Sequence, residues 1–194
     1  DRLRKDFIKV MKEMGGFAQL LMQHGTCGLT SGLVACGATP VKNWRHTGTQ
    51  SFANLDKIGD PDTVIQYQKR KYGCANCPIA CGGIFNVDAG KYPVGETHKP
   101  EYETIGAFGT MCMCDDFETI IKLNEMCNRS GLDTISAGTA LAFAMECFEN
   151  GMLFGPCGVG GAVLKLIPPL TIPDEDLQAG LAIFSQAIDR QMEA

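Results

Sequence analysis

Three cysteines lie within eight consecutive residues near the middle of the chain. Cys74, Cys77 and Cys81 have the spacing C-x2-C-x3-C, with one glycine before the run and two after it. Two residues between the first pair let the chain wrap around one corner of a cubane cluster, and a further turn brings up the third sulfur. Thiolates are the donors that iron–sulfur clusters prefer, and the glycines let backbone N–H groups approach cluster sulfurs. The run therefore predicts three ligands of a [4Fe–4S] cluster.

Other interpretations of this run stay open. A zinc site usually needs a second C-x2-C pair or a pair of histidines, and Cys112-Met113-Cys114 is too tight to supply one. A redox-active cysteine pair would lie between a strand and a helix, whereas this pair is expected to follow a helix and is joined by a third cysteine. A fourth ligand comes either from outside the chain or from one of the cysteines Cys112, Cys114, Cys127, Cys147 and Cys157.

Composition excludes several classes of protein. Hydrophobic residues make up 45% of the chain, which is enough for a buried core. The net charge is −5 and no block of lysine or arginine occurs, so no nucleic-acid partner is expected. No stretch approaches the roughly 20 apolar residues of a membrane-spanning helix, so no membrane is expected either. Ten cysteines, three of them crowded together, favour a reducing interior such as the cytoplasm over a disulfide-bonded secreted protein.

Apolar residues recur at helical spacing along much of the chain. Asp60-Pro61 is typical of a helix start, because aspartate caps free N–H groups and proline suits the first helical position. Asp115 and Glu118 resemble a capping box, and Gly131 is expected to end the helix that follows them. The helices expected are residues 1–24 with a break at Gly15-Gly16, 60–71, 115–130, 134–150 and 174 onward. In the helix over 134–150, the side chains expected to face inward are Leu141, Ala144, Met145 and Phe148. In the last helix they are Leu177, Leu181, Phe184 and Ile188.

Little β structure is expected. Residues 84–87 and 91–94 can pair as a hairpin across a turn at 88–90, and the glycine-rich residues 25–60 are expected to be irregular. The predicted fold class is mainly α, an irregular multi-helix domain with long loops and at most one small β-hairpin. This domain is expected over residues 1–167, followed over 168–194 by a proline-punctuated linker and a terminal helix. Since the chain lacks an initial methionine, a fragment or a processed product is expected.

Four motifs, in consistent order along the chain, resemble one family. Residues 74–83 are similar to the cluster-binding run of the tungsten-containing aldehyde:ferredoxin oxidoreductases. Pro100-Glu101-Tyr102-Glu103-Thr104 resembles that family's P-E-Y-E-T stretch. Residues 127–136 resemble its pterin-contacting G-L-D-T segment, and residues 37–44 resemble the entry to its second domain. The resemblance covers about residues 20 to 151, and it fades from Phe154 onward.

This resemblance implies a three-domain enzyme, of which the chain is the first of two α-helical domains that cover a β-rich cofactor base. It implies oxidation of an aldehyde to a carboxylic acid at a tungsten (or molybdenum) bis-pterin centre, with electrons passing through the [4Fe–4S] cluster to ferredoxin. The fourth cluster cysteine would come from the later domain, and the fragment alone would be inactive. Two alternatives remain: a related benzoyl-CoA-type reductase subunit, and a non-catalytic iron–sulfur or zinc binding module.

The resemblance also implies roles for residues at matching positions. Cys74, Cys77 and Cys81 would ligate the cluster. Glu103, or else Glu101, would be the acidic group near the tungsten that relays protons or orients a water molecule. Each of these two carboxylates can instead be a solvated loop charge.

The pterin contacts implied are Asn128, Gly131, Leu132 and Asp133. Asn128 stands where the family often has aspartate, so the charge of that contact is lost. Asp133 can instead cap the helix that follows it. The partners expected are ferredoxin, the remaining domains of the same enzyme and a small-molecule aldehyde or acid, and a homodimer is compatible with the resemblance.

Overall fold

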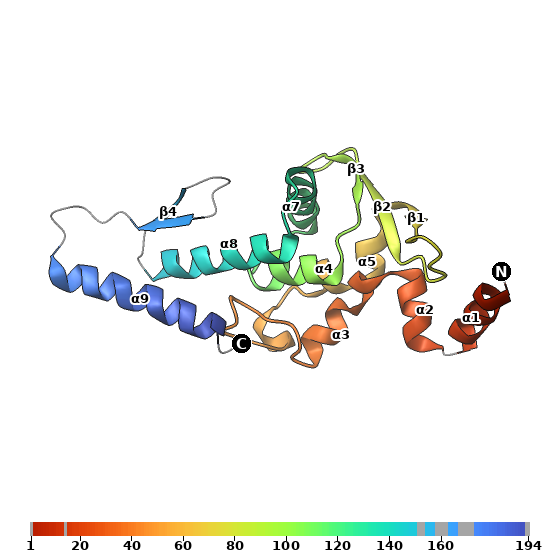
Figure 1. The fold of residues 1–194 in the computed structure, drawn as a ribbon, viewed down its shortest axis with the longest axis horizontal. Coiled ribbons are helices and arrows are strands. Elements are labelled where there is room, and N and C mark those ends of the chain that lie inside the picture. The colour runs from red at the N-terminus through yellow and green to blue at the C-terminus, as the bar shows by residue number, and fades with distance from the viewer. Residues whose placement is uncertain (1, 14, 151–153, 158–162, 167–172, 193–194) are drawn as a thin grey trace. The chain divides into compact units, whose positions relative to one another are not determined.

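The computed structural model describes residues 2–13, 15–150, 154–157, 163–166 and 173–192 (Figure 1). The chain divides into two compact units, unit 1 (Asp1–Thr139) and unit 2 (Ala140–Ala194). Helices provide most of the regular structure, so the mainly α class is confirmed. Within the described part of the chain, the helices are too short or too polar to cross a membrane.

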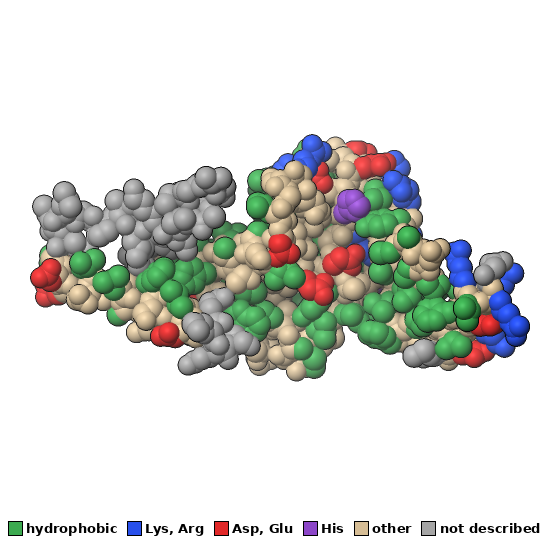
Figure 2. Space-filling model, viewed as in Figure 1, with side chains coloured by type: hydrophobic (Ala, Val, Ile, Leu, Met, Phe, Trp, Pro, Cys, Tyr) green, Lys and Arg blue, Asp and Glu red, His purple; other side chains and the backbone are tan. Residues whose placement is uncertain are grey.

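Unit 1 begins with two helices, α1 (Arg2–Glu13) and α2 (Gly16–Gln23). The predicted break between them is confirmed, and Gly15 lies there with φ +59°, a conformation that residues with a side chain rarely adopt. None of the residues of α1 is buried, and Figure 2 shows basic side chains gathered on the N-terminal part of the molecule.

The segment expected to be irregular contains several short helical turns. These are η1 (Thr26–Leu29), α3 (Thr30–Ala35), η2 (Thr49–Ser51) and α4 (Asp56–Gly59). Each spans at most six residues, which is too short for an apolar period to be recognised in a sequence. The rest of the segment is irregular, as predicted.

The helix predicted over residues 60–71 is wrong in its second half. Asp60 does cap α5 (Pro61–Ile65), since its carboxylate accepts a hydrogen bond from the Thr63 amide at 2.8 Å. The chain then forms a strand, β1 (Gln68–Tyr72). Its residues include three basic side chains that are individually good helix formers. Pairing with a neighbouring strand outweighs that preference.

A three-stranded antiparallel sheet of order β1-β2-β3 forms the β part of unit 1. Strand β2 (Gly82–Val87) is central and almost wholly buried, and it confirms the strand expected at 84–87. Its hairpin partner is β3 (Gly95–His98), which begins after the predicted residues 91–94. The sheet is therefore one strand larger than the expected hairpin, because β1 also pairs with β2.

Four helical segments complete unit 1: α6 (Tyr102–Ile105), the π-helical turn η3 (Gly106–Thr110), α7 (Phe117–Ser130) and the start of α8 (Thr134–Glu149). Asp116, one residue beyond the predicted cap, accepts hydrogen bonds from the Glu118 and Thr119 amides. Gly131 ends α7 with φ +67°, as predicted. The core joins sheet and helices through Phe85, Ile105, Ile120 and their buried neighbours.

Helix α8 passes very close to η3. A Cβ atom built on Gly138 would lie 2.8 Å from the carbonyl carbon of Ala107. Gly138 is itself buried. The two backbones can therefore approach this closely only because position 138 has no side chain.

Unit 2 contains the remainder of α8, a strand pair of β4 (Phe154–Cys157) and β5 (Val163–Leu166), and α9 (Asp174–Met192). The small core is formed by Phe143, Cys147 and Ala187, with the Phe143 and Phe184 rings 5.8 Å apart. The predicted boundary at residue 167 and the linker prolines 168 and 169 lie outside the described residues, so this domain division stays a prediction.

The predicted inward faces of α8 and α9 are wrong in part. On α8, Leu141, Met145 and Phe148 are exposed, and the buried apolar side chains are Ala142, Phe143 and Cys147 instead. This part of α8 is apolar almost all round, so the sequence does not mark which side packs inward. On α9, Phe184 is half-buried as expected, whereas Leu181 and Ile188 are exposed.

Replacing Asp116 with alanine is expected to lower the free energy of unfolding by about 1 kcal/mol, because the first N–H groups of α7 lose their acceptor. Asp116→Asn is the matched control and should cost less, since asparagine caps helices as well as aspartate does. Urea unfolding followed by circular dichroism measures both changes. Equal losses in the two variants would show that capping is not what Asp116 contributes.

Candidate functional site

The predicted cluster cysteines lie in the loop of residues 73–81, which connects β1 to β2. The run therefore follows a strand and not the expected helix. The loop turns tightly: the Cys77 amide donates to the Cys74 carbonyl at 3.0 Å, and Asn76 and Ala80 have positive φ angles. Cys74 is exposed, and Cys77 and Cys81 are half-exposed. All three are free thiols that a ligand can reach.

Glycines allow the strands that bound this loop to pack closely. A Cβ atom on Gly82 would lie 2.6 Å from the Tyr72 ring, which lies across it. A Cβ atom on Gly73 would lie 3.0 Å from the Cα of Ala80. At these two positions the glycines provide space for neighbouring atoms of the loop and sheet.

A buried lysine connects the loop to the rest of unit 1. The Lys99 ammonium donates one hydrogen bond to the Cys81 carbonyl, at 2.7 Å, and another to the His24 carbonyl at the end of α2. Lys99 is 3% exposed. The last cysteine of the run is thereby fixed against helix α2.

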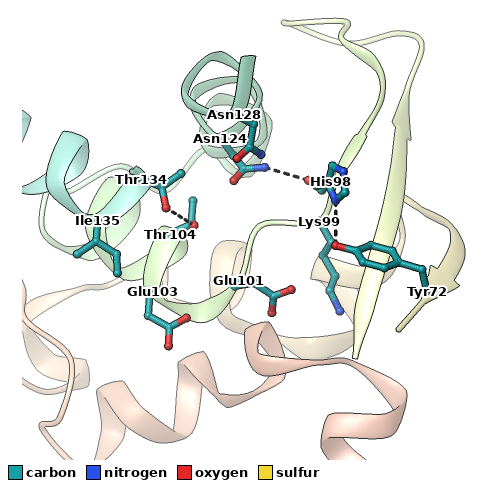
Figure 3. Close-up of a pocket in the computed structure, with 10 residues that line it drawn as sticks. All are labelled: Tyr72, His98, Lys99, Glu101, Glu103, Thr104, Asn124, Asn128, Thr134 and Ile135. Atoms are coloured by element: carbon teal, nitrogen blue, oxygen red, sulfur yellow. Dashed lines mark hydrogen bonds between the residues drawn. The ribbon is translucent and has the colours of Figure 1, made fainter. Parts of the chain in front are cut away.

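A cavity of about 590 Å³ lies beside the loop (Figure 3). Three of the predicted site residues line it: Glu101, Glu103 and Asn128. The first two come from the start of α6, and Asn128 comes from α7, across the cavity in the view of Figure 3. Figure 2 shows acidic side chains exposed on this face of the molecule, near a histidine.

The two predicted carboxylates differ in their surroundings. Glu101 is half-buried and accepts a hydrogen bond from the Thr26 hydroxyl. Glu103 is exposed, and no hydrogen bond or ion pair of its side chain is found within the described residues. Glu101 is therefore fixed by the fold, while Glu103 is available to a molecule in the cavity.

Tyr72 lies between the cysteine loop and the cavity. Its hydroxyl shares a hydrogen bond of 2.9 Å with Nδ1 of His98, whose ring meets the tyrosine ring edge-on at 5.3 Å. The pKa of Tyr72 is raised, first by desolvation and then by the negative charges of Glu101, Cys74 and Cys81. These three groups therefore all lie within electrostatic reach of one hydroxyl. Tyr72 therefore lines the cavity and also directly precedes the cysteine loop.

The remaining predicted pterin contacts do not line the cavity. Gly131, Leu132 and Asp133 form the exposed turn between α7 and α8. The Asp133 carboxylate accepts a hydrogen bond from the Ser136 amide at 2.7 Å, and this bond lowers the pKa of Asp133. Asp133 thus caps α8 in this structure. A pterin contact at this turn stays a prediction.

Several residues of the cavity were missed from the sequence. His98 ends β3, at a position that no recognised motif includes. Asn124 lies one helical turn before Asn128 on α7, so the 3.6-residue period could have found it. Tyr72 and Lys99 directly precede recognised motifs. The full set of missed residues is Tyr72, His98, Lys99, Thr104, Asn124, Thr134 and Ile135.

The cysteines outside the loop differ from those within it. Burial raises the pKa of the Cys112 thiol to about 12 and that of the Cys27 thiol to about 11. Cys127 and Cys147 are also buried, and desolvation raises the pKa of each. These thiols pack as small apolar groups. In the part of the chain that the structure describes, no three His, Cys, Asp or Glu side chains converge as ligands of one metal ion.

Comparison with known proteins identifies the family. The profile of "Aldehyde ferredoxin oxidoreductase, domains 2 & 3" matches residues 2–165. The tungsten-containing aldehyde ferredoxin oxidoreductase of Pyrococcus furiosus is 39% identical over 131 residues, which are 68% of this chain and 20% of that protein. That of Pyrococcus horikoshii is 33% identical over 153 residues, 79% of this chain and 23% of that protein. The chain belongs to the aldehyde ferredoxin oxidoreductase family, as predicted.

The chain spans about a fifth of the length of these curated relatives. A second, shorter similarity links it to a different class of enzyme. The diaminobutyrate–2-oxoglutarate transaminase of Marinococcus halophilus is 48% identical over 46 residues, which are 24% of this chain and 11% of that protein. This share is too small to make the chain a transaminase.

Replacing Gly82 with alanine is expected to lower the free energy of unfolding by about 1–3 kcal/mol, because the new methyl group overlaps the Tyr72 ring. In a Tyr72→Ala background the same change should cost less, since the ring is gone. Denaturant unfolding of the four proteins in this double-mutant cycle measures the coupling. An additive cycle would contradict the contact between the two positions.

Proposed function

We propose that this chain is the cluster-bearing part of an oxidoreductase that oxidises aldehydes to carboxylic acids. The single observation that carries the proposal is the position of Tyr72, which joins a loop of three accessible thiols to an acidic cavity. An enzyme of this kind needs a reaction cavity with an electron acceptor close by. Family membership and the tungsten named in the relatives' descriptions support this assignment.

The cysteine loop suits a [4Fe–4S] cluster. Cys74, Cys77 and Cys81 would each bind a different iron, so their sulfurs need not converge on one point as the ligands of a single ion do. They are free and reachable, whereas the buried cysteines are kept protonated by desolvation. The fourth thiolate would come from another part of the enzyme.

The cavity residues would handle protons and water. Oxidation of an aldehyde adds one oxygen from water and releases two protons and two electrons. A tungsten (or molybdenum) bis-pterin, when bound, would supply the two-electron chemistry. Glu103, which faces the cavity without a partner among the described residues, would accept a proton or orient the water. Glu101, bound by the Thr26 hydroxyl, would keep a fixed negative charge beside it. Asn128 would offer an amide to the cofactor or substrate.

The partners proposed follow from the same assignment. The remaining domains of the enzyme would provide the cofactor base, so the chain alone would be inactive, and ferredoxin would receive the electrons. Free thiols in this number suit the cytoplasm. A benzoyl-CoA-type reductase subunit and a non-catalytic iron–sulfur or zinc module remain the alternatives. The short transaminase similarity supports no transaminase activity, because it covers only 11% of that protein.

Anaerobic reconstitution with iron and sulfide should give about four irons per chain and broad absorbance near ~400 nm. Cys77→Ser should remove most of both, because serine is a poor ligand for the cluster. Cys36→Ser is the matched control, since Cys36 is also free and exposed but lies in α3's C-terminal turn, outside the loop. Uptake of one zinc with no iron would favour the binding module instead.

Glu103→Gln in the intact enzyme should reduce kcat for aldehyde oxidation by about 100-fold or more, the usual effect of losing a proton-transfer group. Iron content should not change, because Glu103 lies outside the cysteine loop. Asp62→Asn, which removes an exposed carboxylate from the first turn of α5, is the control and should keep full activity. Retention of wild-type kcat by Glu103→Gln would remove this residue from the mechanism.

A further inference from the structure

Lys99 has contacts that the proposed reaction does not yet use. It follows β3 directly, and its amide donates to the Gly83 carbonyl at 2.8 Å, which continues the pairing with β2. Its ammonium donates to the Cys81 carbonyl at 2.7 Å and to the His24 carbonyl. Lys99 therefore connects the sheet, the last cysteine of the loop and the end of α2.

Gly25 makes this arrangement possible. A Cβ atom on Gly25 would overlap the Lys99 ammonium and lie 2.5 Å from the Cys81 carbonyl oxygen. Gly25 also has φ +80°, which favours glycine. Both the space and the backbone conformation at position 25 thus allow the ammonium to reach the loop.

The Lys99 ammonium forms no salt bridge with a carboxylate among the described residues, although Glu101 acts electrostatically on the same neighbour, Cys27. Its hydrogen-bond acceptors are two neutral backbone carbonyls, and among the described residues it takes part in no ion pair. A buried cation needs a nearby negative charge, because its desolvation cost is otherwise only partly offset. The hydrogen bond to the Cys81 carbonyl holds the Lys99 ammonium next to the last cysteine of the loop.

We propose that Lys99 is a positioning residue that fixes Cys81 and whose buried positive charge raises the reduction potential of the cluster held by Cys74, Cys77 and Cys81, an inference that rests on the proposed function. Reduction adds one electron to an already anionic cluster. A fixed cation beside it stabilises the reduced form more than the oxidised form, and the effect is large where water is excluded. The anionic cluster would in turn be a counter-charge for the Lys99 ammonium.

The test is a redox titration of the cluster, followed by electron paramagnetic resonance, in the intact enzyme and in Lys99→Met. Methionine keeps much of the side-chain length and removes the charge. The midpoint potential should fall in Lys99→Met. Lys71→Met is the matched control: it removes the same charge from an exposed position near the loop, where water screens it, so its shift should be smaller. A Lys99→Met cluster with the wild-type potential would overturn the proposal.

A variant that retains the charge covers the case in which Lys99→Met assembles no cluster. Lys99→Arg should then bind iron and titrate with a potential near that of the wild type. Failure of Lys99→Arg to do so would overturn the role of the charge. Iron analysis of the unsubstituted enzyme distinguishes failure of the proposed function from failure of the role of Lys99. Absence of iron in the unsubstituted enzyme refutes the proposed function. Presence of iron there, together with an unchanged midpoint potential in Lys99→Met, refutes only the role of Lys99.

Discussion

Antiparallel pairing of β1 with β2 is the constraint on which the site depends. Tyr72 and Gly82 are partners in this register, and they flank the cysteine loop on either side. Residues that face each other across an antiparallel ladder have Cα atoms only about 5 Å apart. The pairing therefore closes residues 73–81 into a compact loop, whatever the loop itself contains. It also places the Tyr72 ring over Gly82, where the hydroxyl faces both the loop and the cavity.

The cysteines are divided by burial into two groups with different chemistry. In the loop, three free thiols are exposed or half-exposed, so a metal can reach them. Elsewhere in the described chain, burial raises the thiol pKa of Cys27, Cys112, Cys127 and Cys147, because the interior disfavours a thiolate. A high cysteine content therefore does not mean a high number of ligands.

Much of the fold could be predicted because its signals are local. Gly15, Asp60 and Gly131 act through their own backbone or through an amide three residues away, so each marks a helix end in the sequence itself. The strand β1 could not be predicted, because Gln68, Arg70 and Lys71 are extended only through pairing with residues 83–85. The inward face of α8 was missed for the opposite reason: apolar side chains surround that helix.

The site, like the fold, could be predicted only where its residues belong to local sequence motifs. Motifs located Glu101, Glu103 and Asn128, which do line one cavity. Tyr72, His98 and Lys99 were missed because their importance comes from contacts with distant residues: Tyr72 with His98, and Lys99 with residues 24 and 81. No spacing rule brings such positions together before the sheet is formed.

The close crossing of α8 over η3 at Gly138 has a consequence for what the cavity can accept. Thr134, one turn before this glycine, shares a hydrogen bond of 2.8 Å with Thr104, and both hydroxyls belong to the cavity wall. The close packing of α8 on η3 thus helps to fix the position of Thr134 in the cavity wall. The absence of a side chain at position 138 thereby influences the size of the molecule that the cavity can accept.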